Sequence, residues 1–460
     1  ALDPEREILY VPTGSAAPDF YGGIRKGMNL FSDCLLALDA NTGNRLWHFQ
    51  FIHHDLWDRD PPAPPNLIDV RQDGERIPAV AQVTKQGYVF VFNRVTGEPL
   101  FEIREEKVPA SSLYGEQAWP FQPVPVKPRP FARQSQDLTT ADLSPYAPEA
   151  DSLIQRFQQL DTRRFAPPGL NPVLMLPGFD GGAEWGGAGA DPDQGILYVN
   201  SNEMPWILQM RETPGLDGEL SQGESIYRTY CMMCHQAGRE GLAASGYPSL
   251  IDIGSRLSES EILQRISNGK GMMPAFPQLG DSEKKELLSF LLEEAESPGA
   301  LPVKGDKKEV TDTDGAAPVL PYQFMGYTKF LDSNGHPAIA PPWGTLHAID
   351  LNSGDYLWSV PLGDTPELST KDSLPTGTEN YGGPVVTENG LLFIAATKDG
   401  YFRAFDRNTG ALLWEYELPA PAFATPALYE VDGKQYIALA CGGEKLGTRK
   451  GNKIIAFSLE

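Results

Sequence analysis

The sequence predicts an all-β fold of the β-propeller type, interrupted by one all-helical module. A strand–turn–strand motif occurs four times at two nearly equal spacings, and 46 Gly and 41 Pro residues supply many turns. The clearest helix-capping signals gather between residues 215 and 298. Short strands with frequent turns favour a sheet fold, whereas capping signals before amphipathic runs favour helices.

Composition limits the function classes. The 460 residues include 38 basic and 61 acidic side chains, so the formal net charge is −23. This charge disfavours nucleic acid or an anionic membrane as the main partner, because phosphates would be repelled. A hydrophobic fraction of 41% and a charged fraction of 22% are typical of a globular protein. No run of 18 apolar residues occurs, so we expect no membrane-spanning helix.

The repeated motif is a strand, a tight turn that starts with Asp or Asn and ends with Gly, and a second strand closed by an aromatic residue. Asn93 follows Asp39 by 54 residues, and Asp406 follows Asp350 by 56. Such a period corresponds to one four-stranded blade per repeat, although unrelated hairpins in a β-sandwich are the alternative. The copies are Leu36–Trp47, Val91–Phe101, His347–Trp358 and Ala404–Trp414.

Two different segments interrupt the period. Residues 106–180 are rich in Pro and predict a loop layer with one short helix over Asp151–Leu160. Further on, Ser258-Glu-Ser-Glu261 predicts a capping box, and Asp281 predicts the start of another helix. The expected domains are a propeller part over 1–214, a helical domain over 215–298, a linker over 299–316 and a second propeller part over 317–460.

The sequence Cys231-Met-Met-Cys234-His235 is typical of covalent haem attachment, in which two thiols bind the haem and the His binds the iron. A redox-active thiol pair and half of a zinc site are the alternatives. Met273, followed by Pro, is expected to be the second iron ligand, with Met272 as its rival. The stretch resembles a class I cytochrome c domain.

Covalent haem attachment normally takes place outside the cytoplasm, so we expect a periplasmic or other extracytoplasmic location. The remaining cysteines, Cys34 and Cys441, lie in strand-like segments and are expected to be buried thiols, although a bridge between them stays open. The chain begins without Met or a signal peptide, and we expect it to be a mature or truncated piece of a longer protein.

The stretch His53-His54-Asp55-Leu56-Trp57-Asp58 concentrates groups that can move protons, directly after the first copy of the motif. A polar corner with a packed Trp is the structural alternative. Together with Gly178–Gly187, Pro341–Leu346 and Asn380–Pro384, it resembles the quinoprotein dehydrogenases, and most closely the glucose dehydrogenase branch that uses pyrroloquinoline quinone (PQQ).

The resemblance implies an eight-bladed propeller with PQQ on its axis, from which the amino-terminal blades are expected to be missing here. It implies that Asp58 is the catalytic base and that Lys85 contacts the cofactor. Lys85 would otherwise be a solvated loop residue, and ordinary blade packing is the alternative for the aromatic residues. The positions implied to line the PQQ pocket are Trp185, Tyr381, Gly382 and Gly383.

Two departures from the glucose enzymes leave the metal and the substrate open. Ala17 stands where they carry a hydroxyl residue at a divalent metal site, for which Ca²⁺ is expected. Glu444 and Lys445 stand where they carry a His that contacts the substrate. An aldose, a polyol or another alcohol would therefore suit this sequence as well as glucose.

The resulting hypothesis is a quinohaemoprotein dehydrogenase that oxidises a sugar or alcohol with PQQ, with membrane association left open. It would pass the electrons through haem c to a quinone or cytochrome acceptor. A non-catalytic propeller scaffold that carries an electron-transfer cytochrome is the alternative. A third possibility is that this chain is inert without its missing blades.

Overall fold

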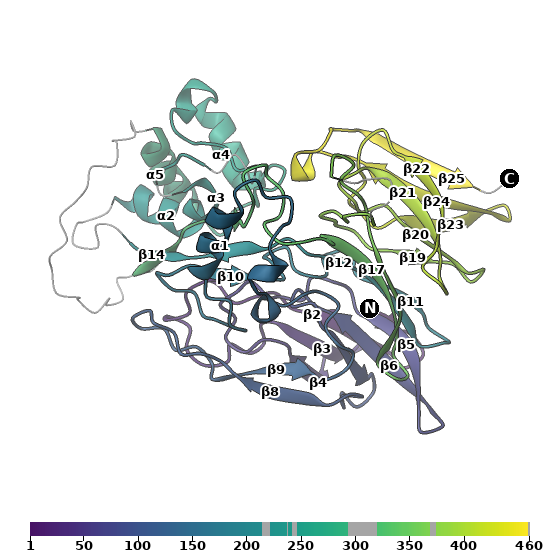
Figure 1. Cartoon of the computed structure of the whole chain (residues 1–460). Helices are drawn as coiled ribbons and strands as arrows, with labels where there is room; N and C mark the ends of the chain where they lie inside the picture. The colour runs from purple at the N-terminus through teal and green to yellow at the C-terminus, as the bar shows by residue number, and fades with distance from the viewer. Residues whose placement is uncertain (214–220, 237, 242–245, 293–319, 369–373, 459–460) are drawn as a thin grey trace. The chain divides into compact units, whose positions relative to one another are not determined.

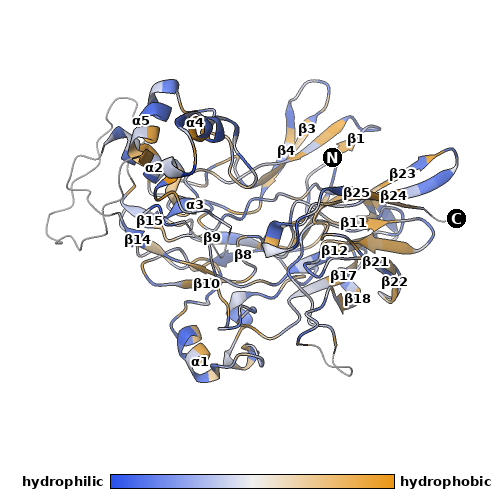
Figure 2. Ribbon diagram, turned by 90° about the horizontal axis from the view of Figure 1, so that it is seen from above, coloured by the Kyte–Doolittle hydropathy of each residue, from blue (hydrophilic) through white to orange (hydrophobic). Residues whose placement is uncertain are grey.

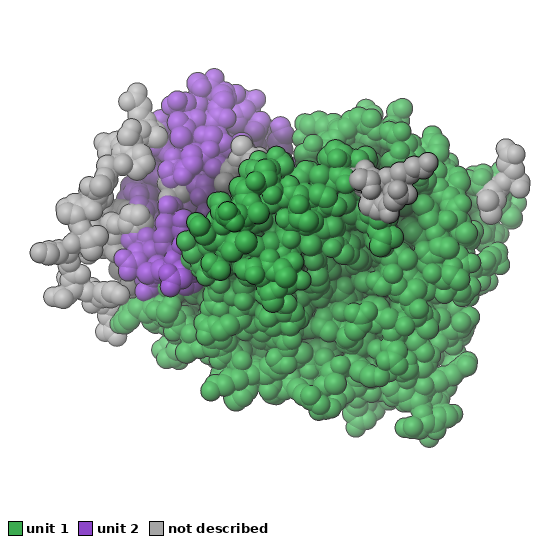
Figure 3. Space-filling view, in the orientation of Figure 1, with its two compact units in different colours: residues 1–168, 172–207, 329–460 green, residues 169–171, 208–328 purple. Residues whose placement is uncertain are grey.

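The computed structural model describes residues 1–213, 221–236, 238–241, 246–292, 320–368 and 374–458. The chain forms two compact units, coloured separately in Figure 3. The first comprises residues 1–168, 172–207 and 329–460, and the second comprises 169–171 and 208–328. The second unit contains the stretch predicted to be helical, whereas the expected linker 299–316 lies outside the described residues. Among the described helices, none is long and apolar enough to cross a membrane.

The first unit is built from antiparallel sheets whose strands follow one another in a meander (Figure 1). Three of them have four strands, in the orders β1-β2-β3-β4, β11-β12-β17-β18 and β19-β20-β21-β22. Two further meanders have three strands, β5-β6-β7 and β23-β24-β25, and a separate three-stranded sheet has the order β10-β13-β16. Their bounds are β1 Leu2–Asp3, β2 Ile8–Pro12, β3 Cys34–Asp39, β4 Arg45–Gln50, β5 Asn66–Gln72, β6 Glu75–Val83, β7 Val89–Asn93, β11 Gly189–Asp191, β12 Ile196–Asn202, β17 Gly344–Asp350, β18 Asp355–Pro361, β19 Val385–Val386, β20 Leu391–Ile394, β21 Tyr401–Asp406, β22 Leu412–Glu417, β23 Ala427–Val431, β24 Lys434–Cys441 and β25 Lys453–Ser458.

One sheet of the first unit is assembled from two distant parts of the chain. β12 pairs with β17 over seven residues, from Ile196 opposite Asp350 to Asn202 opposite Gly344. The second unit is therefore inserted in the chain between the second and third strands of one blade-like sheet. Both ends of the insertion are fixed by this ladder, so the sheet keeps its meander order despite the interruption.

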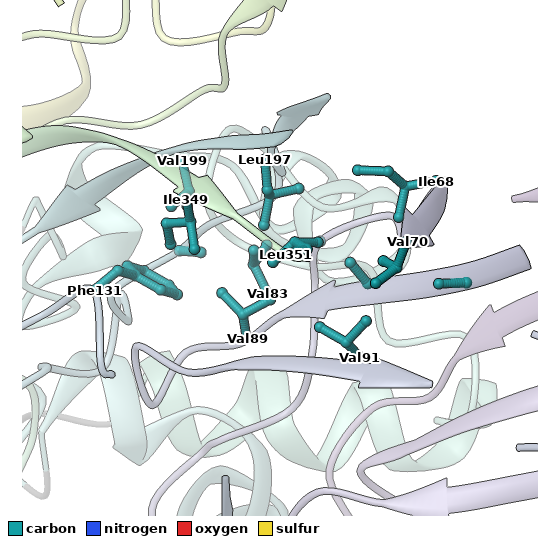
Figure 4. Packing of buried hydrophobic residues seen from close by; sticks show 14 of the residues in the cluster. Ile68, Val70, Val83, Val89, Val91, Phe131, Leu197, Val199, Ile349 and Leu351 are labelled. Carbon is teal, nitrogen blue, oxygen red and sulfur yellow. The ribbon is translucent and has the colours of Figure 1, made fainter. Parts of the chain in front are cut away.

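The core of the first unit lies between neighbouring sheets. Figure 4 shows Ile68 and Val70 of β5 and Val91 of β7 in one apolar cluster with Leu197 of β12 and Ile349 of β17. β17 is buried along almost its whole length, as expected for a central strand covered on both faces. Removing this apolar surface from water is the main stabilising contribution.

The predicted hairpins form at three of the four motif copies. In the first, Asp39 Oδ1 accepts the backbone N–H of Thr42 at 2.7 Å, and Gly43 has a φ of 73°. A side-chain acceptor at the start of a turn and a glycine at its left-handed end are the chemistry that the motif predicts. In the second copy, only a bridge between Phe92 and Pro99 follows the turn, so its predicted second strand is not formed. Pro99 has no N–H to offer a ladder.

In the first and third copies, the closing aromatic packs on the turn glycine of the next copy. A Cβ on Gly97 would lie 2.7 Å from the Trp47 ring, whose indole N–H donates to the Arg94 carbonyl at 3.1 Å. A Cβ on Gly410 would lie 2.7 Å from the Trp358 ring in the same way. Only glycine leaves room for the ring, so this contact explains why the aromatic and the glycine recur together.

The Pro-rich segment of the first unit contains the predicted short helix and an unpredicted hairpin. Helix α1 (Ala150–Gln158) is amphipathic (Figure 2), and its buried residues Leu153 and Phe157 belong to a cluster with Phe330 and Trp343. The hairpin pairs β8 (Ile103–Lys107) with β9 (Phe121–Pro125). The remaining short elements, some of them outside this segment, are η1 Ser135–Asp137, η2 Thr140–Asp142, β10 Val173–Met175, β13 Trp206–Leu208, β16 Thr328–Lys329 and η5 Lys445–Gly447.

The second unit has four described α-helices and one strand pair. The capping box at Ser258 is formed, with Glu261 bonding back to it, and Asp281 is the first residue of its helix. Buried Tyr227 and Leu287 belong to the apolar core of this unit. The bounds are β14 Met210–Glu212, α2 Gln222–Tyr230, α3 Met232–His235, η4 Ile253–Ser255, α4 Glu259–Asn268, α5 Asp281–Leu292 and β15 Tyr322–Phe324.

Candidate functional site

The first candidate site begins at the turn formed by residues 53–58, which follows β4 and which we call the His53–Asp58 turn. His54 and Asp58 both have a left-handed backbone, with φ of 51° and 57°. Such a conformation costs a non-glycine residue free energy and persists only where surrounding contacts hold it. The Asp55 carboxylate does so from inside the turn, because it accepts the N–H groups of Trp57 at 2.9 Å and Arg59 at 2.7 Å.

Lys85 anchors the far end of this turn. It lies between β6 and β7, is buried, and extends its ammonium group to Asp58 Oδ1 at 3.0 Å and to the Asp58 carbonyl at 3.2 Å. The same ammonium donates to Asp60 Oδ1 at 2.5 Å. Two carboxylates and one cation thus meet at a single point, where the structure brings together two residues that the sequence analysis selected.

Burial changes the proton affinity of these groups. Loss of solvation raises the pKa of Asp58 to about 8, Lys85 opposes the rise, and the neighbouring Asp60 adds to it. Burial acts to lower the pKa of Lys85, but Asp58 and Asp60 raise it above its ordinary value. Asp58 can therefore exchange a proton near neutral pH, whereas Lys85 stays charged.

A glycine-rich loop, Gly178–Gly187, covers Lys85. The N–H of Gly182 donates to the Lys85 carbonyl at 2.8 Å, and a Cβ on Gly181 would lie 2.6 Å from Lys85 Cγ. The loop carries Glu184, whose pKa is raised to about 8 by burial and by Asp180, against the effect of Lys85. It also carries Trp185, whose side chain is 73% exposed.

Tyr381, Gly382 and Gly383 lie against the same loop. A Cβ on Gly186 would lie 2.3 Å from Gly382 Cα, and Thr425 Oγ1 joins the two segments by accepting the Gly383 N–H at 3.0 Å and donating to the Gly186 carbonyl at 3.0 Å. Tyr381 is buried, and burial together with the nearby Asp180 carboxylate raises the pKa of its phenol. All six residues selected for the propeller thus lie around the Gly178–Gly187 loop and the His53–Asp58 turn.

Sequence reasoning missed several groups of this site. Asp60 and Glu184 were not selected, although each lies within two residues of a selected position. Lys445 was noted only as a departure, yet its ammonium lies 3.5 Å from the centre of the Tyr381 ring, a cation–π contact. The signal in the sequence that could have identified them is that they are polar residues close to a selected site residue.

The second candidate site lies in the second unit, at α3. Cys231 and Cys234 carry free thiols, and Cys34 and Cys441 of the first unit are free and buried, as expected. His235 is buried, and its Nδ1 lies 2.8 Å from the Pro248 carbonyl, which leaves Nε2 available as a ligand atom.

Two methionines compete for the second position at this site. Met273 packs against the apolar cluster that contains Cys231, whereas the side chain of Met272 is 58% exposed. Among the described residues of both units, no three His, Cys, Asp or Glu side chains converge as a metal-ion site.

Two family models match the chain. A family model described as the β-propeller domain of glucose/ethanol/alcohol dehydrogenases, the PQQ family, matches residues 1–234 and 286–437. A second model, for subunit III of cbb3-type cytochrome c oxidase, matches residues 218–291.

Full-length relatives extend well beyond this chain. A probable quinate dehydrogenase (quinone) of Xanthomonas campestris pv. juglandis is 31% identical over 100% of this chain and 49% of its own length. The quinoprotein glucose dehydrogenase of Escherichia coli K12 is 28% identical over 100% of the chain and 48% of its own length. The chain thus spans about half the length of the curated relatives it matches.

A solved structure supports the fold. The quinohemoprotein alcohol dehydrogenase of Comamonas testosteroni aligns with a TM-score of 0.53 and 18% identity, over 99% of this chain and 47% of that one. The motif prediction, the sheet architecture and the family match agree: the chain belongs to the PQQ family of glucose/ethanol/alcohol dehydrogenases.

Proposed function

We propose that this chain is the catalytic half of a quinohaemoprotein dehydrogenase that oxidises a sugar, such as glucose or another aldose, or an alcohol. The observation that carries the proposal is the buried contact of 3.0 Å between Asp58 and Lys85 at the end of a strained turn. A scaffold has no need for a carboxylate that exchanges its proton near neutral pH beside a fixed cation.

Each residue of this pair has a distinct role in the proposed reaction. Ionised Asp58 accepts the proton of the substrate hydroxyl while the carbon that bears it loses a hydride and becomes a carbonyl. Lys85 holds the Asp58 carboxylate in position and presents positive charge where negative charge develops on the acceptor. PQQ, when bound, supplies the two-electron acceptor for that hydride.

The residues around the Gly178–Gly187 loop fit a planar, polar cofactor. The largely exposed Trp185 indole offers a flat apolar surface, and Gly382 and Gly383 let the backbone approach closely. Asp180 Oδ2 is a buried oxygen without a protein partner and is available to a ligand donor. We propose that Lys85, Trp185, Tyr381, Gly382 and Gly383 line this cofactor pocket.

The donor set at α3 fits a covalently bound haem. Free Cys231 and Cys234 would form the thioether bonds, His235 Nε2 would bind the iron, and Met273 would be the second ligand. The packing of Met273 beside Cys231 supports it over exposed Met272. Haem c supplies one-electron transfer when bound, which would lead to a quinone or cytochrome acceptor in the periplasm or another extracytoplasmic compartment.

The described residues do not fit a protein-built divalent cation site. Ala17 offers no side-chain oxygen, and the Ser15 hydroxyl donates to Asp55 at 2.6 Å. The calcium expected from the resemblance would need ligands from elsewhere, and we derive no step through it.

We also propose that further blades complete an eight-bladed propeller around this chain. No described atom lies within 4 Å of a Cβ position on Gly43, and Trp414 is 41% exposed. Among the described residues, the first turn glycine therefore has no aromatic ring packed on it, and the last closing aromatic packs on no turn glycine. A blade that precedes Gly43 in the ring would supply an aromatic residue, and one that follows Trp414 would supply a glycine turn.

Binding of PQQ tests the proposed pocket. PQQ titrated into the protein should bind saturably, and Lys85→Met should weaken binding by about tenfold to a hundredfold, since a charge-assisted bond contributes about 1.5–3 kcal/mol. Lys398→Met is the matched control, because it makes the same exchange at a lysine that is exposed. Failure of the protein to bind PQQ at any concentration would favour the scaffold alternative.

A further inference from the structure

The two histidines of the His53–Asp58 turn have no part in the proposed chemistry, yet both are buried. The His54 ring is 1% exposed, with Nε2 at 2.9 Å from Glu116 Oε1 and Nδ1 at 2.7 Å from the Gly27 carbonyl. The other carboxylate oxygen of Glu116 accepts the N–H of Gly22. The arrangement joins the turn to two loops that are distant in sequence.

The two hydrogen bonds of the His54 ring require one hydrogen more than a neutral imidazole and a carboxylate carry together. A carbonyl oxygen only accepts, so Nδ1 of His54 must carry a hydrogen toward Gly27. Nε2 faces a carboxylate oxygen of Glu116, and this contact needs a hydrogen as well. Both contacts are therefore made only while the ring and the carboxyl group together hold two hydrogens, one toward Gly27 and one between His54 and Glu116.

The pair has no room to rearrange. A Cβ on Gly22 would lie 2.3 Å from His54 Nε2, so the loop that carries Gly22 approaches the ring as closely as backbone can. Gln122 fixes the preceding residue, because its amide accepts the His53 N–H at 2.8 Å and donates to the His53 carbonyl at 2.7 Å. The start of the turn is thus held by side chains from the segment that follows β8.

Other charged groups also face the pair. Arg25 acts electrostatically with Glu116, and its guanidinium donates to the carbonyls of Asp55 and Asp19. Glu105 lies 3.9 Å from the neighbouring His53 ring. These groups surround the pair without replacing either of its two hydrogen bonds.

The pair is coupled to Asp58 through strained backbone. His54 and Asp58 are the two left-handed residues of the turn, and contacts at each end add to those that Asp55 makes inside it. Lys85 holds the Asp58 end, and Glu116 holds the His54 end through the ring. If the His54 end relaxes, the carboxylate of Asp58 loses its fixed position beside Lys85.

We propose that Glu116 is a positioning residue of the dehydrogenase reaction: by holding the His54 ring, it keeps the base Asp58 aligned with Lys85. The inference rests on the proposed function only for the role of Asp58 as base. The alignment itself is a property of the chain without substrate, PQQ or haem.

The test compares Glu116→Ala with Glu116→Gln and follows the Asp58 carboxyl by ¹³C NMR, its signal being identified by loss in Asp58→Asn. A glutamine can accept the Gly22 N–H and donate to a neutral His54, so it keeps both hydrogen bonds without the charge. We expect the Asp58 midpoint, near pH 8 in the unaltered protein, to remain within a few tenths of a unit in Glu116→Gln. In Glu116→Ala it should move upward by more than one unit, because the Lys85 charge that lowers the pKa of Asp58 would no longer lie beside it.

One outcome would overturn the proposal: an Asp58 titration in Glu116→Ala that overlays that of the unaltered protein. If Glu116→Ala does not fold, Glu116→Asp replaces it. The shorter acid keeps the charge but cannot reach both His54 and Gly22, so a smaller shift in the same direction is expected, and no shift would refute the proposal.

Enzyme kinetics then separate positioning from a general structural role. In the holoenzyme, Glu116→Ala should lower kcat by about tenfold or more with KM within about twofold, and Glu116→Gln should restore kcat, because misplacing a base affects the chemical step. If no variant or unaltered enzyme turns over substrate, the proposed function fails. The NMR result stands independently of that failure, since it needs no cofactor.

Discussion

Replacing Gly410 by Ala should destabilise the first unit much more than the same replacement at Gly43. Both glycines end the same type of turn with nearly the same backbone, at φ of 71° and 73°. They differ in one respect: a Cβ on Gly410 would lie 2.7 Å from the Trp358 ring, whereas a Cβ on Gly43 meets no described atom within 4 Å.

The expected magnitudes follow from this difference. Alanine in a left-handed turn costs about 1 kcal/mol at either position. At Gly410 the methyl group also displaces the Trp358 ring and breaks the indole hydrogen bond to the Arg407 carbonyl, now 2.9 Å long. Overpacking costs about 1–3 kcal/mol, so Gly410→Ala should lower the free energy of unfolding by about 2–4 kcal/mol in total.

Urea unfolding, followed by circular dichroism of the β signal, would measure both losses. Equal losses for Gly410→Ala and Gly43→Ala would refute the aromatic–glycine packing as a stabilising contact. The same pair also tests the proposed further blades. In a protein that contains them, Gly43→Ala should become as costly as Gly410→Ala, because an aromatic residue would then occupy the space above Gly43.

Three further predictions concern the two sites. The value of kcat/KM should rise with pH up to about 8 and then level off, because ionised Asp58 is the active form and burial raises its pKa to about 8. A kcat/KM that does not change between pH 6 and pH 9 would contradict this. Asp60→Asn should weaken the hold on Lys85, now 2.5 Å from Asp60, and lower kcat by about tenfold, whereas unchanged kinetics would show that Asp58 alone positions Lys85. Met273→Ala should abolish the methionine-ligand absorption of the oxidised haem, and Met272→Ala should leave it intact; the reverse pattern would exchange their roles.

Much of the fold could be predicted because its signals are local. Turn chemistry at Asp39 and Gly43, and the capping box at Ser258, involve residues within four positions of one another, so they can be read from the sequence. The haem-binding motif is local in the same sense. The contact of Trp47 with Gly97 joins residues fifty positions apart, and only the structure connects them, although the repeat contained both.

The same difference between local signals and long-range contacts applies to the candidate site. Asp58 and Lys85 were identified through a family resemblance and not by physical reasoning, because the sequence alone does not show that their side chains lie 3.0 Å apart. Glu116 was missed altogether, since it lies in an irregular Pro-rich segment whose path over the His53–Asp58 turn depends on tertiary contacts. Burial, which raises the pKa of Asp58 and Glu184, is likewise a property of the folded chain.

The most direct measurement is reduction of the haem by substrate. Oxidised, PQQ-loaded and haem-loaded full-length protein would be mixed without oxygen with a panel of aldoses and alcohols while the haem spectrum is recorded. The account predicts that at least one substrate reduces the haem and that Asp58→Asn abolishes this, although dithionite still reduces it. A protein that binds PQQ and whose haem responds to dithionite, but to no sugar or alcohol, would contradict the account.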